Sequence, residues 1–151
     1  MREVDQAAIL GKLATHFDVP PPTLHDSAEW AVAYSHDRHV RIYPDAPECI
    51  VLHEFAHHLC EERLQGRIKR ARDSDTRQGW REAGRLEQRL EHRHRADYFD
   101  ALVEVVGFWY EGDLTKYPWQ FEYCVLRRRW AKLRAESRPE VPDSQTSAKT
   151  A

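Results

Sequence analysis

The chain has 151 residues, about the length of one domain, with 32% charged residues and a formal net charge of −2. Hydrophobic residues make up 41% of it, which is enough for an ordinary core and too much for a disordered chain. No apolar run approaches the roughly 18 residues of a membrane span, and residues 1–10 carry acids where a signal peptide has a basic and then an apolar region. We therefore expect a soluble protein with no membrane partner.

The first predicted element is a helix over residues 4–17, where apolar side chains recur at helical spacing. Three consecutive prolines, residues 20–22, follow it and predict a connector. Two short β-prone runs, residues 30–34 and 39–43, flank a four-residue turn and predict a β-hairpin. Pro44 and Pro47 end the second strand.

Most of the remaining chain has a helical pattern. Pro47 and Glu48 suit the first turn of a helix that reaches about residue 64, and the polar stretch 65–78 predicts an exposed loop. A long second helix is expected over residues 77–110, a turn over 114–117, and a last helix over 118–136. The fold class predicted is α+β: mainly helical, with a small antiparallel sheet before the first long helix.

Residues 1–136 are expected to form a single domain, and residues 137–151, rich in Ser, Thr, Pro and Lys, a disordered tail. The three cysteines, Cys49, Cys60 and Cys124, lack the paired spacings of a disulfide framework or a cysteine-based zinc site. A reducing cytoplasm is therefore the expected location.

The strongest motif is His53-Glu54-Phe55-Ala56-His57, an H-E-x-x-H sequence within a predicted helix. Histidines four residues apart lie one turn apart on one side of a helix, so both imidazoles can bind one zinc ion. Glu54 is offset by about 100° and can act as general base toward water whose pKa zinc lowers to about 7. The motif predicts a zinc cofactor, with His53 and His57 as ligands and Glu54 as the catalytic residue.

A catalytic zinc site needs a third protein ligand and keeps one position for water. His94 lies on the apolar stripe of the predicted second helix and is the preferred candidate. Glu104 flanks the same stripe and is the alternative. Nearby polar residues have other expected roles: His58 points away from the metal, and Cys60 is a reduced core thiol. Oxyanion stabilisation stays open among three tyrosines, Tyr98, Tyr117 and Tyr123.

The order of these features resembles the minimal zincin metallopeptidase core. It is most similar to SprT-like and related small bacterial zincins, whose third ligand stands in an H-G-x-x-F type pattern. The matching stretch begins at His94, with Arg95 at the glycine position and Tyr98 at the phenylalanine position, and the resemblance spans residues 29–106. It implies that His53, His57 and His94 are zinc ligands and that Glu54 is the catalytic base.

The favoured function is therefore a zinc metallopeptidase that acts on a peptide or protein substrate by zinc-activated water. The alternative is a non-catalytic module of the same fold. Residues 61–95 and 127–151 each carry a net charge of +4, so such a module could bind nucleic acid or a protein partner through its Arg-rich helices.

Overall fold

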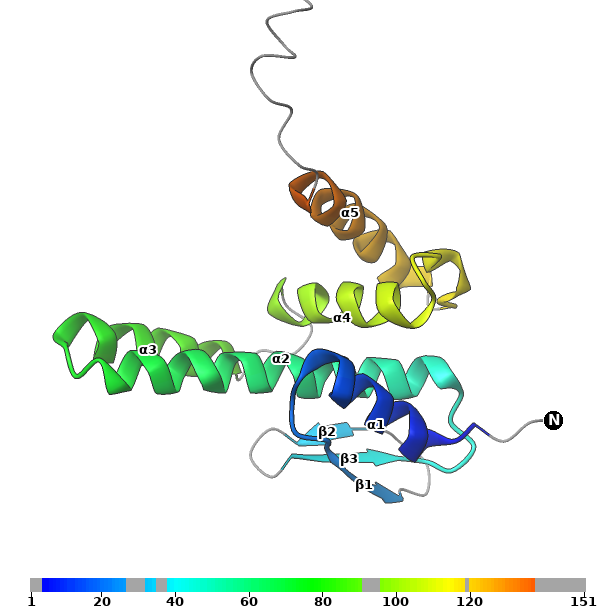
Figure 1. Ribbon diagram of the computed structural model, residues 1–151, viewed down its shortest axis with the longest axis horizontal. Helices are drawn as coiled ribbons and strands as arrows, with labels where there is room; N and C mark the ends of the chain where they lie inside the picture. Colours follow the sequence, from blue (N-terminus) through cyan, green and yellow to red (C-terminus); the bar gives the residue numbers. More distant parts are fainter. Residues whose placement is uncertain (1–3, 27–31, 35–37, 91–95, 119, 138–151) are drawn as a thin grey trace, which may run out of the picture.

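The structure is a computed structural model that describes residues 4–26, 32–34, 38–90, 96–118 and 120–137 (Figure 1). Its elements are, in chain order, helix α1 (Gln6–Phe17), strands β1 (Thr23–Asp26), β2 (Val32–Tyr34) and β3 (His39–Ile42), helices α2 (Glu48–Asp73), α3 (Arg77–Leu90) and α4 (Ala96–Trp109), the 3-10 helix η1 (Leu114–Lys116) and helix α5 (Gln120–Ser137). The protein is mainly helical with a small sheet, which confirms the α+β class. None of the helices described is both long enough and apolar enough to cross a bilayer.

Helix α1 forms where the apolar pattern predicts it. The Asp5 side chain accepts a hydrogen bond from the Ala8 amide at 3.0 Å and so caps the first turn. Asp18 adopts a left-handed conformation with φ of +53° and ends the helix two residues before the first proline, Pro20. The apolar side of α1 packs against α2 and the sheet, burying four residues, Ile9, Leu10, Leu13 and Ala14.

The sheet has three strands in the order β1-β3-β2. Strands β2 and β3 pair antiparallel, with Val32 opposite Arg41 and Tyr34 opposite His39, as the predicted hairpin requires. The predicted antiparallel pair is present, but the sheet as a whole is mixed, because a strand that was not predicted, β1, pairs parallel to β3, with Thr23 opposite His39. Its sequence, Thr-Leu-His-Asp, has little intrinsic strand preference, so the partner strand and not local propensity fixes it.

Two predictions for residues 65–110 are wrong. Helix α2 does not end near residue 64 but continues to Asp73, and the predicted loop is reduced to a turn before α3. The reason is tertiary: Leu64 and Ile68 of α2 are buried against Ala83 and Leu86 of α3, in a second small core. The expected single helix over residues 77–110 is two helices, α3 and α4, and residues 91–95 between them lie outside the described part of the chain.

The first half of α2 is the centre of the fold. The sheet and α1 lie on one side of it and α4 on the other (Figure 1), and all eleven residues from 49 to 59 are buried. Helix α5 then crosses over α4, where the Trp130 ring packs on Gly107. The main core therefore lies on both sides of α2, and any polar residue in this half of α2 needs a partner from another element.

Gly107 provides a test of the contact between α4 and α5. A Cβ atom there would lie 2.6 Å from the Trp130 ring, so we expect Gly107→Ala to lower the free energy of unfolding by about 1–3 kcal/mol through overpacking. Gly84, in an exposed part of α3 with no atom within 4 Å of an added Cβ, is the matched control. Gly84→Ala should raise stability by about 0.5–1 kcal/mol, because alanine has the higher helix propensity. Urea unfolding of both variants measures this; equal stabilisation by both would contradict the packing.

Candidate metal centre

The H-E-x-x-H residues lie in the buried half of α2. His53, Glu54 and His57 are only 8%, 4% and 5% exposed. The rings of His53 and His57 are neighbours, with their centroids 4.8 Å apart at an angle of 80°. The Glu54 carboxylate lies beside the first of them, with Oε1 3.8 Å from His53 Nε2. The motif predicts this arrangement, in which two imidazoles are neighbours and an acid lies next to one of them.

Helix α5 contributes a carboxylate that the sequence interpretation missed. Glu122 is 1% exposed, and its Oε1 lies 3.1 Å from His53 Nδ1. Its Oε2 accepts a hydrogen bond from the Tyr98 hydroxyl at 2.8 Å, and Tyr117 donates to Oε1 at 3.4 Å. The Tyr98 oxygen is also 2.5 Å from His53 Nδ1. Side chains from α2, α4 and α5 and from the residue after η1 thus meet in one buried cluster.

These contacts determine which nitrogen of His53 carries the proton. An ionised carboxylate only accepts hydrogen bonds, and Tyr98 gives its single proton to Glu122 Oε2. His53 Nδ1 must therefore be the donor toward Glu122 Oε1 and the Tyr98 oxygen. When the ring is neutral, as a metal ligand has to be, its lone pair resides on Nε2, the nitrogen beside Glu54. A histidine that binds a metal commonly has this arrangement, in which a carboxylate fixes the tautomer and orientation of the ring.

The two tyrosines keep their protons. Burial is the main cause that raises the pKa of Tyr98 far above its usual value, and the charge of Glu122 raises it further. Burial followed by Glu122 also raises the pKa of Tyr117. Both phenols therefore stay hydrogen-bond donors to Glu122 throughout the working pH range. The Tyr98 ring also stacks on His57, with centroids 4.3 Å apart, so one side chain contacts both histidines.

The charge of this cluster suits a divalent cation. Two carboxylates, those of Glu54 and Glu122, are buried here, and no lysine or arginine is among the buried residues that the structure describes. Burying carboxylates without a compensating positive charge is costly. A zinc ion bound at the histidines would supply that charge, and imidazole is a preferred zinc ligand. The donor set therefore fits the metal that the motif predicts.

The preferred candidate for the third ligand lies outside the described residues. His94 is within residues 91–95, outside the described part of the chain. Among the residues that are described, no group of three or more His, Cys, Asp or Glu side chains is arranged to hold a metal ion. The first two predicted ligands are therefore placed together, and His94 stays a prediction.

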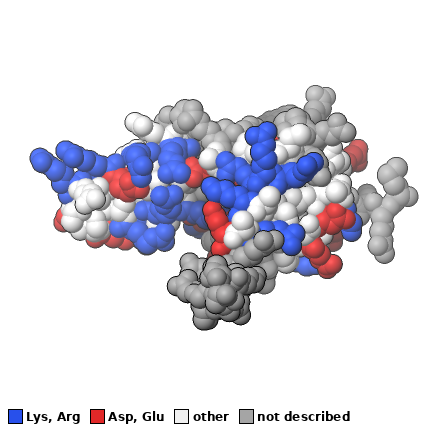
Figure 2. Space-filling view, turned by 90° about the horizontal axis from the view of Figure 1, so that it is seen from above, with Lys and Arg blue, Asp and Glu red and all other residues white. Residues whose placement is uncertain are grey.

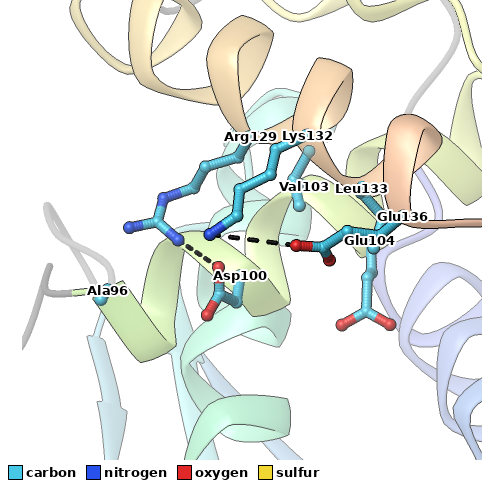
Figure 3. Close-up of a pocket in the computed structure, with 8 residues that line it drawn as sticks. All are labelled: Ala96, Asp100, Val103, Glu104, Arg129, Lys132, Leu133 and Glu136. Atoms are coloured by element: carbon cyan, nitrogen blue, oxygen red, sulfur yellow. Dashed lines mark hydrogen bonds and ion pairs between the residues drawn. The ribbon is translucent and has the colours of Figure 1, made fainter.

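Glu104, the alternative third ligand, is placed elsewhere. Its carboxylate forms an ion pair with Arg63, and its side chain is 35% exposed. It lines a pocket of about 470 Å³ between α4 and α5, together with Asp100 and Arg129 (Figure 3). This pocket is a surface feature lined by charged side chains and does not include His53 or His57. Glu104 does not join the two histidines, so the structure argues against it as a ligand.

The other polar residues have structural roles. His58 Nε2 lies 2.7 Å from the Pro20 carbonyl oxygen, and burial lowers the pKa of its ring. Tyr98 and Tyr117 were candidates for oxyanion stabilisation, but both hydroxyls are engaged with Glu122. The side chain of the third candidate, Tyr123, lies outside the described part of the structure.

A sequence signal for Glu122 did exist. It is the only acid on the buried side of the last helix, one turn before the buried Leu126 and two turns before Trp130. A carboxylate on an apolar helix face indicates a specific partner, because burial of an isolated charge is expensive. The sequence could not identify that partner, since His53 is 69 residues away.

Comparisons with known proteins add nothing to this geometry: no protein-family model, curated protein or solved structure matches the chain.

The cysteines provide a chemical test of the surroundings of the site. Burial, followed by the charge of Asp97, raises the pKa of the Cys60 thiol to about 12. Because the thiolate is the reactive form, alkylation of Cys60 by iodoacetamide at pH 8 should be about a thousandfold slower than that of an ordinary thiol. Burial also raises the pKa of Cys49, whereas Cys124 is exposed on α5. We expect peptide mapping to show Cys124 labelled first; equal rates for Cys60 and Cys124 in folded protein would contradict the packing, and equal rates in urea are the control.

Proposed function

We propose that the protein is a zinc-dependent hydrolase, and specifically a metallopeptidase. The observation that carries the proposal is the buried cluster of His53, His57 and Glu54, in which Glu122 leaves His53 Nε2 with its lone pair beside the Glu54 carboxylate. The bound zinc would polarise the scissile carbonyl and make water acidic enough to attack it at neutral pH.

Glu54 has the position of a general base. It is adjacent in sequence to the first ligand, and its Oε1 is 3.8 Å from the nitrogen that would bind the metal. A carboxylate there can take a proton from the attacking water and then pass it to the leaving amine. Glu54 therefore serves as base and then as acid, while His53 and His57 hold the metal.

We assign His94 as the third ligand. Support comes from Tyr98, four residues later in the sequence, whose ring stacks on His57. The N-terminal end of α4 therefore faces the two histidines on α2. A third histidine would complete the set of three protein ligands that a catalytic zinc site uses.

The experiment is hydrolysis of a fluorogenic peptide library by protein loaded with zinc. We expect cleavage that 1,10-phenanthroline abolishes and that added zinc restores, because metal affinity and catalysis share the same histidines. Cleavage that survives complete zinc removal would refute the proposal, and so would bound zinc with no cleavage of any peptide. All three cysteines are free, and we propose a reducing cytoplasm as the location.

A further inference from the structure

Helices α2 and α3 form an arm that extends beyond α1 and the sheet (Figure 1). We use the term arm for residues 61–90. It has a small core of its own, formed by four residues, Leu64, Ile68, Ala83 and Leu86. Because this core packs the two helices against each other, the outer side chains of the arm project from a rigid pair of helices.

The outer face of the arm is basic. Residues 61–90 contain nine Lys or Arg and six Asp or Glu. Five of the basic side chains form ion pairs with acids, namely Arg63, Arg67, Arg72, Arg85 and Arg89. The other four are exposed, and no ion pair is recorded for them among the described residues: Lys69, Arg70, Arg77 and Arg81. They flank the turn at the distal end, and the space-filling view shows basic side chains along the whole arm (Figure 2).

An exposed tryptophan lies among these charges. Trp80 is 53% exposed and is not part of the arm's core. Its indole nitrogen donates a hydrogen bond to Asp75 Oδ1 at 3.4 Å, which fixes one edge of the ring. One turn further along α3 is Gly84, which has no side chain to cover the ring. An exposed aromatic ring surrounded by basic side chains indicates a binding surface more strongly than a single exposed leucine does.

We propose that the arm binds single-stranded nucleic acid. Arg70, Arg77 and Arg81 would contact phosphates, and an unpaired base would stack on Trp80, which is the usual combination in single-strand binding. A duplex keeps its bases stacked on one another and cannot offer one to the ring. A membrane surface would require a broad apolar helix face, whereas the arm exposes one aromatic ring.

The second basic stretch is a weaker candidate. On α5, Arg129 is paired with Asp100, and Lys132 with Glu136. Arg127 and Arg128 are exposed as well, but the large apolar side chain that α5 exposes among the described residues is Leu133, which has no ring on which a base could stack. The arm is therefore the surface that the observations favour.

The test is fluorescence anisotropy of a fluorescein-labelled 20-nucleotide oligothymidylate with the full chain, over a range of salt concentrations. Trp80→Ala should weaken binding about tenfold, from the stacking lost with one base, whereas Trp80→Phe keeps most of it. The triple variant Arg70→Gln, Arg77→Gln, Arg81→Gln should lower the slope of log K against log salt by about 2, since each phosphate contact on a single strand contributes about 0.7.

A charge-matched control separates the arm from the net charge of the protein. The triple variant Lys116→Gln, Arg127→Gln, Arg128→Gln removes three exposed basic groups outside the arm and should leave both affinity and slope unchanged. The proposal is overturned if this control loses as much affinity as the arm variant, or if a duplex of the same length binds more tightly. Binding to phosphatidylserine vesicles without binding to the oligonucleotide would overturn it as well. Thermal melts confirm that each variant is folded.

Discussion

Glu54→Gln is expected to keep zinc bound and to lower peptide hydrolysis by about 10²- to 10⁴-fold, the usual contribution of a general acid–base group. The amide has nearly the shape of the carboxylate but cannot take a proton from water. Because Glu54 is next to a predicted metal ligand and is not itself predicted to be one, the metal should stay in place. Initial rates and zinc content are measured on the same preparations.

The control for this substitution is Glu104→Gln. It removes a carboxylate of the same type that is paired with Arg63 on the surface, and it should change neither the rate nor the zinc content. Loss of zinc from the Glu54→Gln variant, with no cleavage by the wild type, would instead indicate a structural metal site.

Glu122→Gln is expected to weaken zinc binding by about 10- to 100-fold, the effect found for partners that support a ligating histidine. Glutamine keeps one oxygen that can accept from His53 Nδ1, but its NH2 group replaces the oxygen that accepts from Tyr98. The substitution therefore removes the negative charge that would make the ring a better ligand, together with the hydrogen bond from Tyr98. The measurement is a competition titration with a chromophoric chelator. A buried acid without partners would behave in the opposite way, because removing its charge would stabilise the cluster.

Tyr117→Phe is the matched control for Glu122. It removes the longest contact of the network, at 3.4 Å, and leaves the contacts of Glu122 with His53 and Tyr98. Its zinc affinity should change less than threefold, on the order of one weak hydrogen bond. Equal losses in both variants would mean that general disturbance of the cluster, and not the charge of Glu122, sets the affinity. Unfolding of the metal-free variants in urea reports stability separately.

The local parts of the fold could be predicted from the sequence. Helix α1, the hairpin of β2 and β3, and the start of α2 follow from periodicity, capping residues and prolines, which act over a few residues. The pairing of His53 with His57 belongs to the same class, since a spacing of four on a helix brings two rings together whatever surrounds them.

The parts that could not be predicted depend on distant partners. Strand β1 exists because β3 lies beside it, and the second half of α2 is helical because α3 buries Leu64 and Ile68. The contact of Glu122 with His53 depends on the packing of α5 over α4, which places Trp130 on Gly107. Local sequence patterns do not identify distant partners, and tertiary contacts can override local propensity.

The packing of the helices explains why the partner of His53 is an acid from the last helix, α5. The first half of α2 is buried on both sides, so its polar side chains have to find partners on elements that pack against it. Helix α4 supplies Tyr98 and α5 supplies Glu122, and the two join through a hydrogen bond of 2.8 Å. The predicted metal ligand His53 is thereby held by residues that come late in the chain, and we expect zinc binding to require α5 to be folded in place.

Zinc content per chain, measured by inductively coupled plasma mass spectrometry, tests the central claim most directly. After zinc loading and desalting, we predict about one ion per chain in the wild type, and a large loss in both His57→Ala and His94→Ala. His16→Ala, at an exposed position of α1, should keep the full amount. Equal zinc content in the wild type and His57→Ala, or no zinc in the wild type, would contradict the account.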